Sequence, residues 1–172
     1  VYHMGYVLGP RINAGGRVGK SSHGANLLLN NNAKEVFKIA SELDQFNKER
    51  QILEKDLMDK ILKNLENKTH ESVMVIFGKN WHEGVIGIVA SRIKDKFNKP
   101  VIIISIDKDI GKASARSIVG FDIGSLIISA TQEKILIKGG GHKMAGGFSI
   151  KVENIDKFKE FILKKIKKNN DN

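Results

Sequence analysis

The sequence predicts an α/β protein in which a long connecting helix is followed by a small mixed-sheet domain of about four strands covered by helices. Two patterns predict this fold. Apolar residues recur at helical spacing along one continuous stripe after residue 32. Beyond residue 69, apolar runs of strand length alternate with amphipathic helical patterns.

The first 33 residues show no steady periodicity. Glycine and proline in the segment 9–17 predict an ordered loop, and the asparagines before the stripe predict a turn. Asn32 followed by Glu35 predicts a capping box at which a helix begins. The stripe then continues to about residue 67, which is roughly 50 Å of helix at 1.5 Å per residue. Such a helix is longer than a compact domain of this size needs, so residues 34–68 are expected to bridge two bodies.

The remaining residues, 69–172, alternate between strand and helix patterns. Apolar runs bounded by turn residues predict strands, and apolar stripes at helical spacing predict helices. The expected strands lie at 73–77, 101–106, 112–118 and 148–152. The expected helices cover 85–97, a segment that starts at the N-cap residue Asp122, and 154–168. This order predicts a four-stranded mixed sheet covered by helices.

The composition favours an anionic partner. The net charge is +10 over 172 residues, and basic surfaces attract nucleic acid and other polyanions. Arginine is the more specific signal, because lysine is abundant throughout while there are only five arginines, among them Arg11, Arg17 and Arg116. The absence of cysteine excludes disulfides and thiolate metal sites and fits a reducing cytosol, so a cytoplasmic location is expected. No apolar run reaches the length of a membrane span, and the start at Val1 leads us to expect part of a longer protein.

The segment 139–147 is the strongest candidate site. Five of its nine residues are glycine, and ordering so many glycines costs conformational entropy. Glycines allow several N–H groups to converge on an anion, and His142 and Lys143 supply donors at the rim. The segment therefore predicts a pocket for a phosphate or for the end of a nucleic-acid strand. The alternative is a glycine-rich hairpin with a solvated lysine.

Two further segments are candidate contacts. Lys112, Ser114 and Arg116 share one face of their predicted strand, which is typical of a strand that follows phosphates. The alternative is an edge strand charged against aggregation. Trp81 and His82 lie between a strand and the following helix, where α/β sheets bind ligands and where a helix N-terminus favours an anion. The alternatives for Trp81 are base stacking and closing the end of the sheet.

Two other site classes receive little support. Residues 14–21 nearly spell a P-loop, but that motif needs a buried strand that runs directly into it. Pro10 removes a ladder donor just upstream, so nucleotide binding is the minor alternative. The aspartates are scattered and the histidines do not cluster, so the sequence predicts no metal site and no catalytic residue in this chain.

Four segments together resemble, in order and spacing, the bacterial RecJ exonucleases of the DHH phosphoesterase superfamily. The resemblance covers nearly the whole chain, and its second and fourth segments are specific in combination. The segments are Leu8–Arg17, Trp81–Arg92, Ser114–Ser117 and Gly139–Gly147. One position departs from the family pattern: Glu83 stands where relatives usually have proline, so a negative charge lies beside a site expected to face phosphate.

The resemblance implies a two-lobed enzyme. An N-terminal lobe, which this sequence lacks, carries the Asp-His-His triplet and binds two Mn²⁺ or Mg²⁺ ions, and a long helix leads to a smaller DHH-associated lobe that holds the DNA strand. Residues 1–33 are then the tail of the first lobe, 34–68 the connecting helix and 69–172 the DHH-associated domain. The implied partners are single-stranded DNA and the N-terminal lobe, and this fragment itself is expected to bind no metal.

The resemblance also implies the substrate-binding residues, which fall into three groups. Near the catalytic cleft, the strand is approached by Arg11, Asn13 and Arg17. Backbone phosphates would be contacted by Ser114 and Arg116, and Ser117, Trp81 and His82 are further expected substrate-binding residues. The phosphate or sugar near the 5′ end is held by Gly139, Gly140, Gly141, His142 and Lys143.

The expected function is therefore the substrate-binding part of a metal-dependent 5′→3′ single-stranded-DNA exonuclease that acts in DNA repair and recombination. The fragment alone is expected to hydrolyse nothing. One alternative is a phosphodiesterase of the same superfamily that acts on short oligonucleotides or cyclic dinucleotides. An alternative of another class is a non-catalytic nucleic-acid-binding domain.

Overall fold

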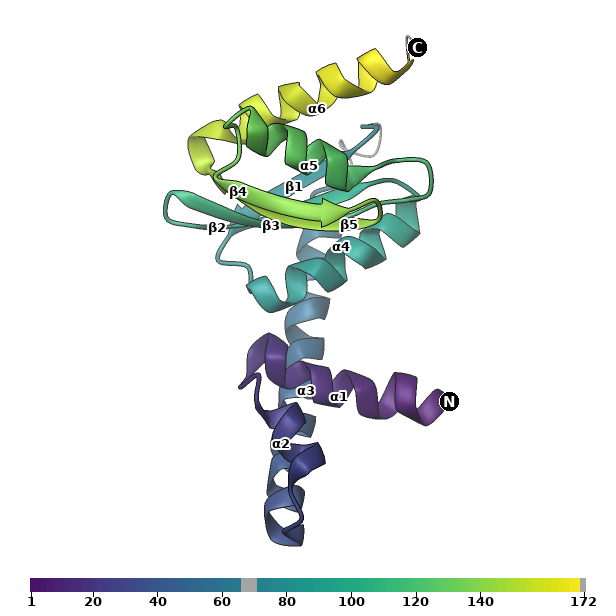
Figure 1. The fold of residues 1–172 in the computed structure, drawn as a ribbon, viewed down its shortest axis with the longest axis vertical. Helices are drawn as coiled ribbons and strands as arrows, with labels where there is room; N and C mark the ends of the chain where they lie inside the picture. Colours follow the sequence, from purple (N-terminus) through teal and green to yellow (C-terminus); the bar gives the residue numbers. More distant parts are fainter. Residues whose placement is uncertain (66–70, 171–172) are drawn as a thin grey trace. The chain divides into compact units, whose positions relative to one another are not determined.

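The computed structural model of the chain describes residues 1–65 and 71–170. The chain divides into two compact units, Val1–Leu57 and Met58–Asn172. Helix α3 (Ala33–Lys63) begins in the first unit and ends in the second. The strands all belong to the second unit, and Figure 1 shows the elements of both.

The elements of the first unit are helical. They are a π-helix (His3–Leu8), α1 (Gly9–Val18), α2 (His23–Leu29) and the first part of α3. The prediction of an ordered loop at 9–17 is therefore wrong, because Pro10 stands in the first turn of α1, where it is compatible with a helix. Glycine allows α1 to pack closely against α3, because a Cβ on Gly15 would lie only 3.0 Å from Cδ2 of the buried Leu43.

Helix α3 begins at the predicted cap. The side chain of Asn32 accepts hydrogen bonds from the backbone N–H groups of Lys34 and Glu35, at 3.0 and 3.5 Å. The helix ends at Lys63, earlier than the predicted end near residue 67. The predicted boundary between residues 68 and 69 lies outside the described residues.

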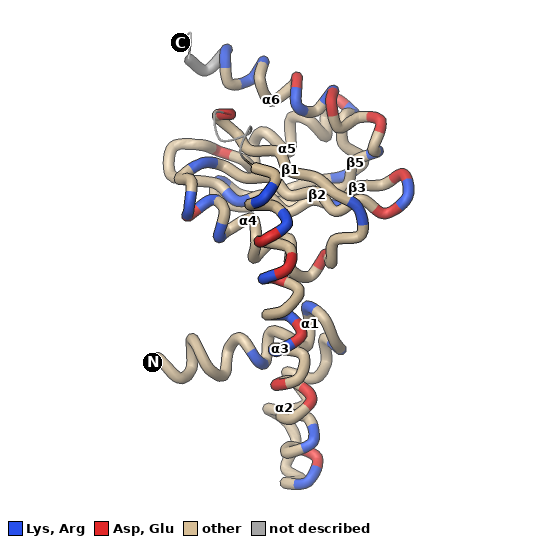
Figure 2. Tube along the Cα trace, turned by 180° about the vertical axis from the view of Figure 1, so that it is seen from behind, with Lys and Arg blue, Asp and Glu red and all other residues tan. Residues whose placement is uncertain are grey.

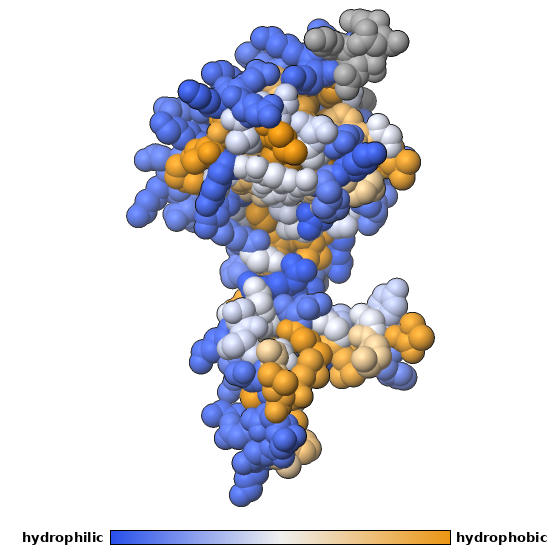
Figure 3. Space-filling view, in the orientation of Figure 1, coloured by the Kyte–Doolittle hydropathy of each residue, from blue (hydrophilic) through white to orange (hydrophobic). Residues whose placement is uncertain are grey.

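Several large apolar side chains of the first unit are exposed to solvent. Tyr6, Leu28, Leu29 and Phe37 keep between 72% and 80% of their surface exposed. Figure 3 shows hydrophobic residues on the surface of this unit. Exposed apolar surface of this extent is typical of a unit that packs against another protein part.

The second unit contains a five-stranded mixed sheet, which confirms the predicted fold class. The strand order is β1-β2-β3-β5-β4, with β1 and β2 parallel and every other pair antiparallel. The strands are β1 (Met74–Lys79), β2 (Val101–Asp107), β3 (Ile110–Arg116), β4 (Lys138–His142) and β5 (Ala145–Lys151). The sheet has one strand more than predicted, because the glycine-rich segment itself forms β4 and the start of β5.

Helices cover both faces of this sheet. Helix α4 (Glu83–Phe97) lies on one face, and α5 (Ile123–Gln132) and α6 (Ile155–Asn170), preceded by a short 3-10 turn (Val152–Asn154), lie on the other (Figure 1). Strand residues such as Ile104 and Phe148 pack with α5 and α6 into one core. We call this side the closed face. On the opposite side, the open face, α4 packs against β2 and β3.

Charged residues are distributed over both helical layers. Figure 2 shows Lys and Arg positions along α4 and α6, with Asp and Glu among them. Of the helices that the structure describes, none combines the length and the apolar character needed to cross a bilayer.

Candidate nucleic-acid interface

Three rows of residues cross the open face of strands β3, β5 and β4. Side chains alternate between the two faces of a strand, so the ladder register places the members of a row side by side on one face. The rows are Lys112, Ser149 and Lys138; then Ser114, Gly147 and Gly140; then Arg116, Ala145 and His142. The middle member of each row, on β5, is small. The predicted β3 face and His142 therefore lie on one surface, roughly 10 Å apart across two strand spacings.

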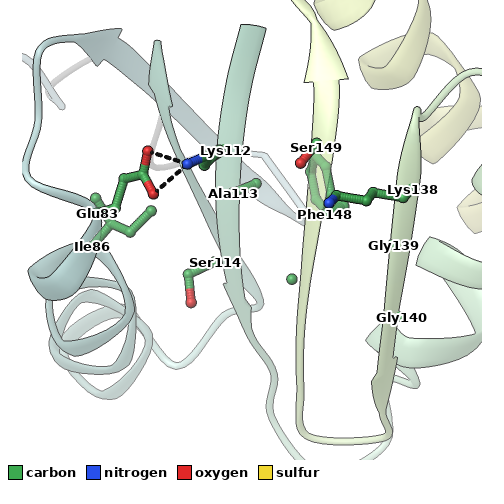
Figure 4. A pocket seen from close by; sticks show the side chains of 11 residues that line it. Glu83, Ile86, Lys112, Ala113, Ser114, Lys138, Gly139, Gly140, Phe148 and Ser149 are labelled. Carbon is green, nitrogen blue, oxygen red and sulfur yellow. Dashed lines mark hydrogen bonds and ion pairs between the residues drawn. The ribbon is translucent and has the colours of Figure 1, made fainter. Parts of the chain in front are cut away.

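A groove with a volume of about 610 Å³ lies over the first two rows. Its floor is formed by β3, β5 and β4, and Glu83 and Ile86 of α4 form a wall (Figure 4). We call it the β3–β5–β4 groove. Figure 3 shows near-neutral residues where the β4–β5 hairpin runs in Figure 1, bordered by hydrophilic residues. Its size lies within the range of small-ligand pockets, and its rim is basic.

The backbone of the glycine segment is extended. Strands β4 and β5 pair as an antiparallel hairpin with residues 143–144 in the turn. Gly120 is the one described glycine with a positive φ. The expectation that several N–H groups of this segment converge on one anion is therefore wrong, because N–H groups along an antiparallel strand point alternately to its two edges. The hairpin, which was the alternative, is what forms.

The glycines of this hairpin divide according to the face that a side chain would occupy. A Cβ on Gly139 would lie 2.7 Å from Phe148 Cβ, and one on Gly146 would lie 2.5 Å from Ile127 Cδ1. These two glycines allow α5 to approach the closed face. A Cβ on Gly140 would meet no atom of the described residues within 4 Å. Packing therefore does not require glycine at position 140. Because Gly140 has no side chain, the floor of the groove is low at this position.

Ser114 and Arg116 are held together beside α4. Arg116 Nη1 donates to Ser114 Oγ at 3.1 Å and to the Ala115 carbonyl oxygen at 2.8 Å. Gly87 of α4 leaves the space they occupy: a Cβ there would lie 2.9 Å from Ser114 Oγ and 3.0 Å from Arg116 Nη2. The helix thus orients a planar guanidinium, whose five N–H donors suit phosphate oxygens.

His142 and Lys143 are exposed at the end of the hairpin. The Nδ1 atom of His142 accepts a hydrogen bond from the Met144 N–H at 3.3 Å. A neutral ring that accepts at Nδ1 carries its proton on Nε2, which makes Nε2 a donor. Lys143 lies near Asp122, whose pKa is lowered mainly by the hydrogen bond from the Ser125 N–H and to a smaller extent by the charge of Lys143.

Three other predicted residues have local partners outside the groove. A Cβ on Gly78 would collide with the Trp81 ring, which lies over the end of β1 and matches the alternative of closing the sheet. His82 caps α4, since its Nδ1 accepts a hydrogen bond from the Gly84 N–H at 3.1 Å. Ser117 is 1% exposed, and its hydroxyl donates to the Phe121 carbonyl oxygen at 2.7 Å.

Arg11, Asn13 and Arg17 lie on α1 in the first unit, whereas the groove is built from the second unit alone. Arg11 Nε donates to Asp44 Oδ1 at 2.8 Å, and Asn13 and Arg17 are exposed. Residues 14–18 of the P-loop-like segment 14–21 belong to α1 itself, and what precedes them is helix and not a strand. The structural context that a P-loop needs is therefore not present.

Sequence reasoning missed part of the groove. Lys138 and Ser149 line it with Lys112 in the first row, but residue 138 was not recognised as part of a strand. If a strand had been predicted from residue 138, the two-residue repeat would have placed Lys138 on the same face as Gly140 and His142. Sequence also gave no sign that Lys112 Nζ pairs with both carboxylate oxygens of Glu83, each at 2.9 Å.

Within residues 1–65 and 71–170, no group of three or more His, Cys, Asp or Glu side chains is placed to hold a metal ion. Besides the Lys112–Glu83 pair, the groove offers the ammonium of Lys138, the hydroxyls of Ser114 and Ser149 and a low floor, which are features of a site that binds an anion.

Comparison with known proteins places this geometry in context. Residues 70–168 match the model of the DHHA1 domain. The chain is 37% identical over 155 residues to the single-stranded-DNA-specific exonuclease RecJ of Bacillus subtilis, covering 88% of this chain and 20% of that protein. RecJ of Thermus thermophilus in complex with Mg²⁺ superimposes with a TM-score of 0.83 at 32% identity, covering 93% of this chain and 25% of that one. An exonuclease RecJ bound to manganese gives a TM-score of 0.79 at 30% identity, covering 93% of this chain and 40% of that one.

Proposed function

Because the chain belongs to the DHHA1 domain family, we propose that it is the substrate-binding part of a metal-dependent 5′→3′ single-stranded-DNA exonuclease of the RecJ type. The proposal rests on relatives named as single-stranded-DNA-specific exonucleases, of which the chain spans 20% in the first case given above. Action in DNA repair and recombination is part of the same proposal.

The three rows on the open face are the observation that carries the proposal. Two rows contain basic side chains on both β3 and β4, and the residues between them on β5 are small. A flexible polyanion can lie across such a floor with cations on either side. Phosphate contacts of this kind fix the position of a strand without reading its sequence.

We assign the third row to the end of the strand. Arg116 presents a guanidinium that Ser114 and α4 orient, and His142 presents an Nε2 donor from the opposite strand. A guanidinium on one side of a small residue and an imidazole N–H on the other suit a terminal phosphate, which has more exposed oxygens than a phosphodiester. Lys143, in the adjacent turn, adds positive charge.

The hydrolytic ions are proposed to come from an N-terminal DHH lobe. RecJ structures contain Mg²⁺ or Mn²⁺, and two such ions activate water and stabilise the leaving oxygen in phosphodiester hydrolysis. The exposed side chains of Tyr6, Leu28, Leu29 and Phe37 are the surface that we assign to contact with that lobe. The chain alone is then expected to bind DNA and to leave it intact in the presence of Mn²⁺.

Fluorescence anisotropy with a labelled single-stranded oligonucleotide tests the proposal. Lys138→Ala removes one cation from the groove rim, and Lys165→Ala removes the same charge from α6 on the closed face. We expect Lys138→Ala to weaken binding by about 5-fold, near 1 kcal/mol, and Lys165→Ala to leave it within about 1.5-fold, since distant exposed charges are screened. Equal losses in the two variants would mean that binding is diffuse, and no binding by the wild-type chain would refute the proposal.

A further inference from the structure

The first row of the groove holds two lysines in different electrostatic states. Lys112 on β3 turns toward α4, where its Nζ is 2.9 Å from both carboxylate oxygens of Glu83 (Figure 4). Lys138 on β4 extends over β5 in the same view. Among the described residues, Lys138 has no ion-pair partner. One lysine of the row is therefore already neutralised by the protein, and the other is available to an anion.

The position of Glu83 makes this pairing relevant to a strand in the groove. Glu83 stands in the first turn of α4 and lines the groove with Ile86 one turn later. Its carboxylate therefore faces the space that a phosphate would occupy. A negative charge at that place repels phosphate directly and also occupies the ammonium that would attract it.

The pairing contributes little to folding. The side chains of Lys112 and Glu83 are 58% and 50% exposed, and exposed ion pairs are weak because water screens them and because both side chains lose rotamer freedom. A carboxylate in this position has a larger effect on a bound anion than on the free energy of unfolding. The two ends of the open face also differ, since Glu83 stands beside the first row, whereas the third row presents Arg116 and His142.

We propose that Glu83 is an internal competitor for Lys112 that weakens this end of the groove for phosphate. This inference rests on the proposed function. A strand is held tightly at the Arg116–His142 row and loosely at the Lys112–Lys138 row, where each arriving phosphate must displace Glu83 from Lys112. Glu83 is thus a positioning residue. By competing for Lys112, it allows the DNA strand to dissociate readily from this end of the groove.

The test is Glu83→Gln, which removes the charge and keeps the shape. The matched control is Glu133→Gln on the closed face, where Glu133 pairs with Lys165 at 3.7 Å. Both changes alter the net charge equally. Anisotropy titrations of a labelled single strand at several salt concentrations measure the affinity and the number of phosphates neutralised. Thermal unfolding of each variant shows that the fold is kept.

Glu83→Gln is expected to tighten binding by about 3- to 10-fold and to steepen the slope of log affinity against log salt by about 0.7, which corresponds to one further phosphate on a single strand. Glu133→Gln should change neither quantity. Lys112→Ala in the wild-type chain should weaken binding, because it leaves the carboxylate of Glu83 unpaired beside the strand, and in the Glu83→Gln chain it should return the affinity close to the wild-type value.

The inference is overturned if Glu83→Gln and Glu133→Gln behave alike while the wild-type chain binds the strand, and the proposed function survives that result. It is also overturned if Glu83→Gln weakens binding, because the carboxylate would then support the site. Glu83→Ala, with no amide to donate a hydrogen bond, must give the same direction of change as Glu83→Gln. If the wild-type chain binds no single strand, the proposed function and this inference fail together.

Discussion

The closed and open faces of the second unit are built from the same strands and have opposite chemistry. On the closed face, Ala115 and Ile150 are fully buried with α5 and α6. On the open face, neighbouring residues of the same strands, such as Ser114 and Gly147, line a groove. The comparison shows that a single glycine-rich hairpin serves two purposes. Glycines on one face admit a helix, and glycines on the other leave a surface clear.

The strongest test of this division substitutes one glycine from each face. Gly139→Ala places a Cβ 2.7 Å from Phe148 Cβ, an atom fixed by its backbone, and should cost about 3 kcal/mol in the free energy of unfolding. Gly140→Ala places its Cβ in open space and should stay within about 0.5 kcal/mol of wild type. Urea unfolding measures both. Equal costs would show that the hairpin glycines are needed for backbone reasons and not for packing on one face.

Arg116→Ala is the next largest test, and it addresses the open face. Loss of a charge-assisted phosphate contact should weaken single-strand binding by about 2 kcal/mol, or about 30-fold. Arg116→Lys should recover part of that loss, because lysine keeps the charge but lacks the planar fork. Anisotropy titrations measure the affinities, and circular dichroism checks the fold. Unchanged affinity in a folded Arg116→Ala chain would remove the third row from the binding surface.

Gly87→Ala separates binding from stability. Alanine in a helix interior is favoured over glycine by about 1 kcal/mol, and the atoms that its Cβ would approach, Ser114 Oγ and Arg116 Nη2, are ends of side chains that can move. We expect unfolding to be unchanged or slightly harder, while single-strand affinity falls about 5-fold, near 1 kcal/mol, because the guanidinium is displaced. Gly16→Ala on α1, with no described atom within 4 Å of its Cβ, is the control that should leave affinity unchanged. A Gly87→Ala chain with wild-type affinity would show that α4 does not orient Arg116.

Sequence patterns predicted the parts of this fold that depend on local periodicity. The helix predicted at 85–97 forms as α4 (Glu83–Phe97), and the strand predicted at 101–106 forms as β2 (Val101–Asp107). Both follow from apolar spacing, and the cap at Asp122 follows from capping chemistry. The shared face of Lys112, Ser114 and Arg116 followed from the two-residue repeat of a strand. Each of these features is set by residues close together in the chain.

The errors arose where distant residues decide the structure. Glycine in 9–17 was interpreted as an ordered loop and glycine in 139–147 as an anion pocket, yet Gly15 packs against Leu43 and Gly139 against Phe148. A strand full of glycine has weak intrinsic preference for its conformation, and it forms here because α5 and β5 hold it in place. The pairing of Glu83 with Lys112, 29 positions apart, was likewise outside the reach of any local pattern.

The smallest expected effect concerns the cap of α5 on the closed face. The Ser125 N–H donates to the Asp122 carboxylate at 2.9 Å, and this hydrogen bond lowers the pKa of Asp122 below its ordinary value of 3.8. A carboxyl whose pKa is lower in the folded chain stabilises the fold above its unfolded pKa and loses that contribution as pH falls through the folded pKa. Asp122→Asn keeps a cap acceptor without the titration, so urea midpoints of the two chains should differ slightly at pH 7 and converge below about pH 4. Midpoints that run parallel from pH 7 to pH 2 would show that the charge of Asp122 contributes nothing to holding α5 on the sheet.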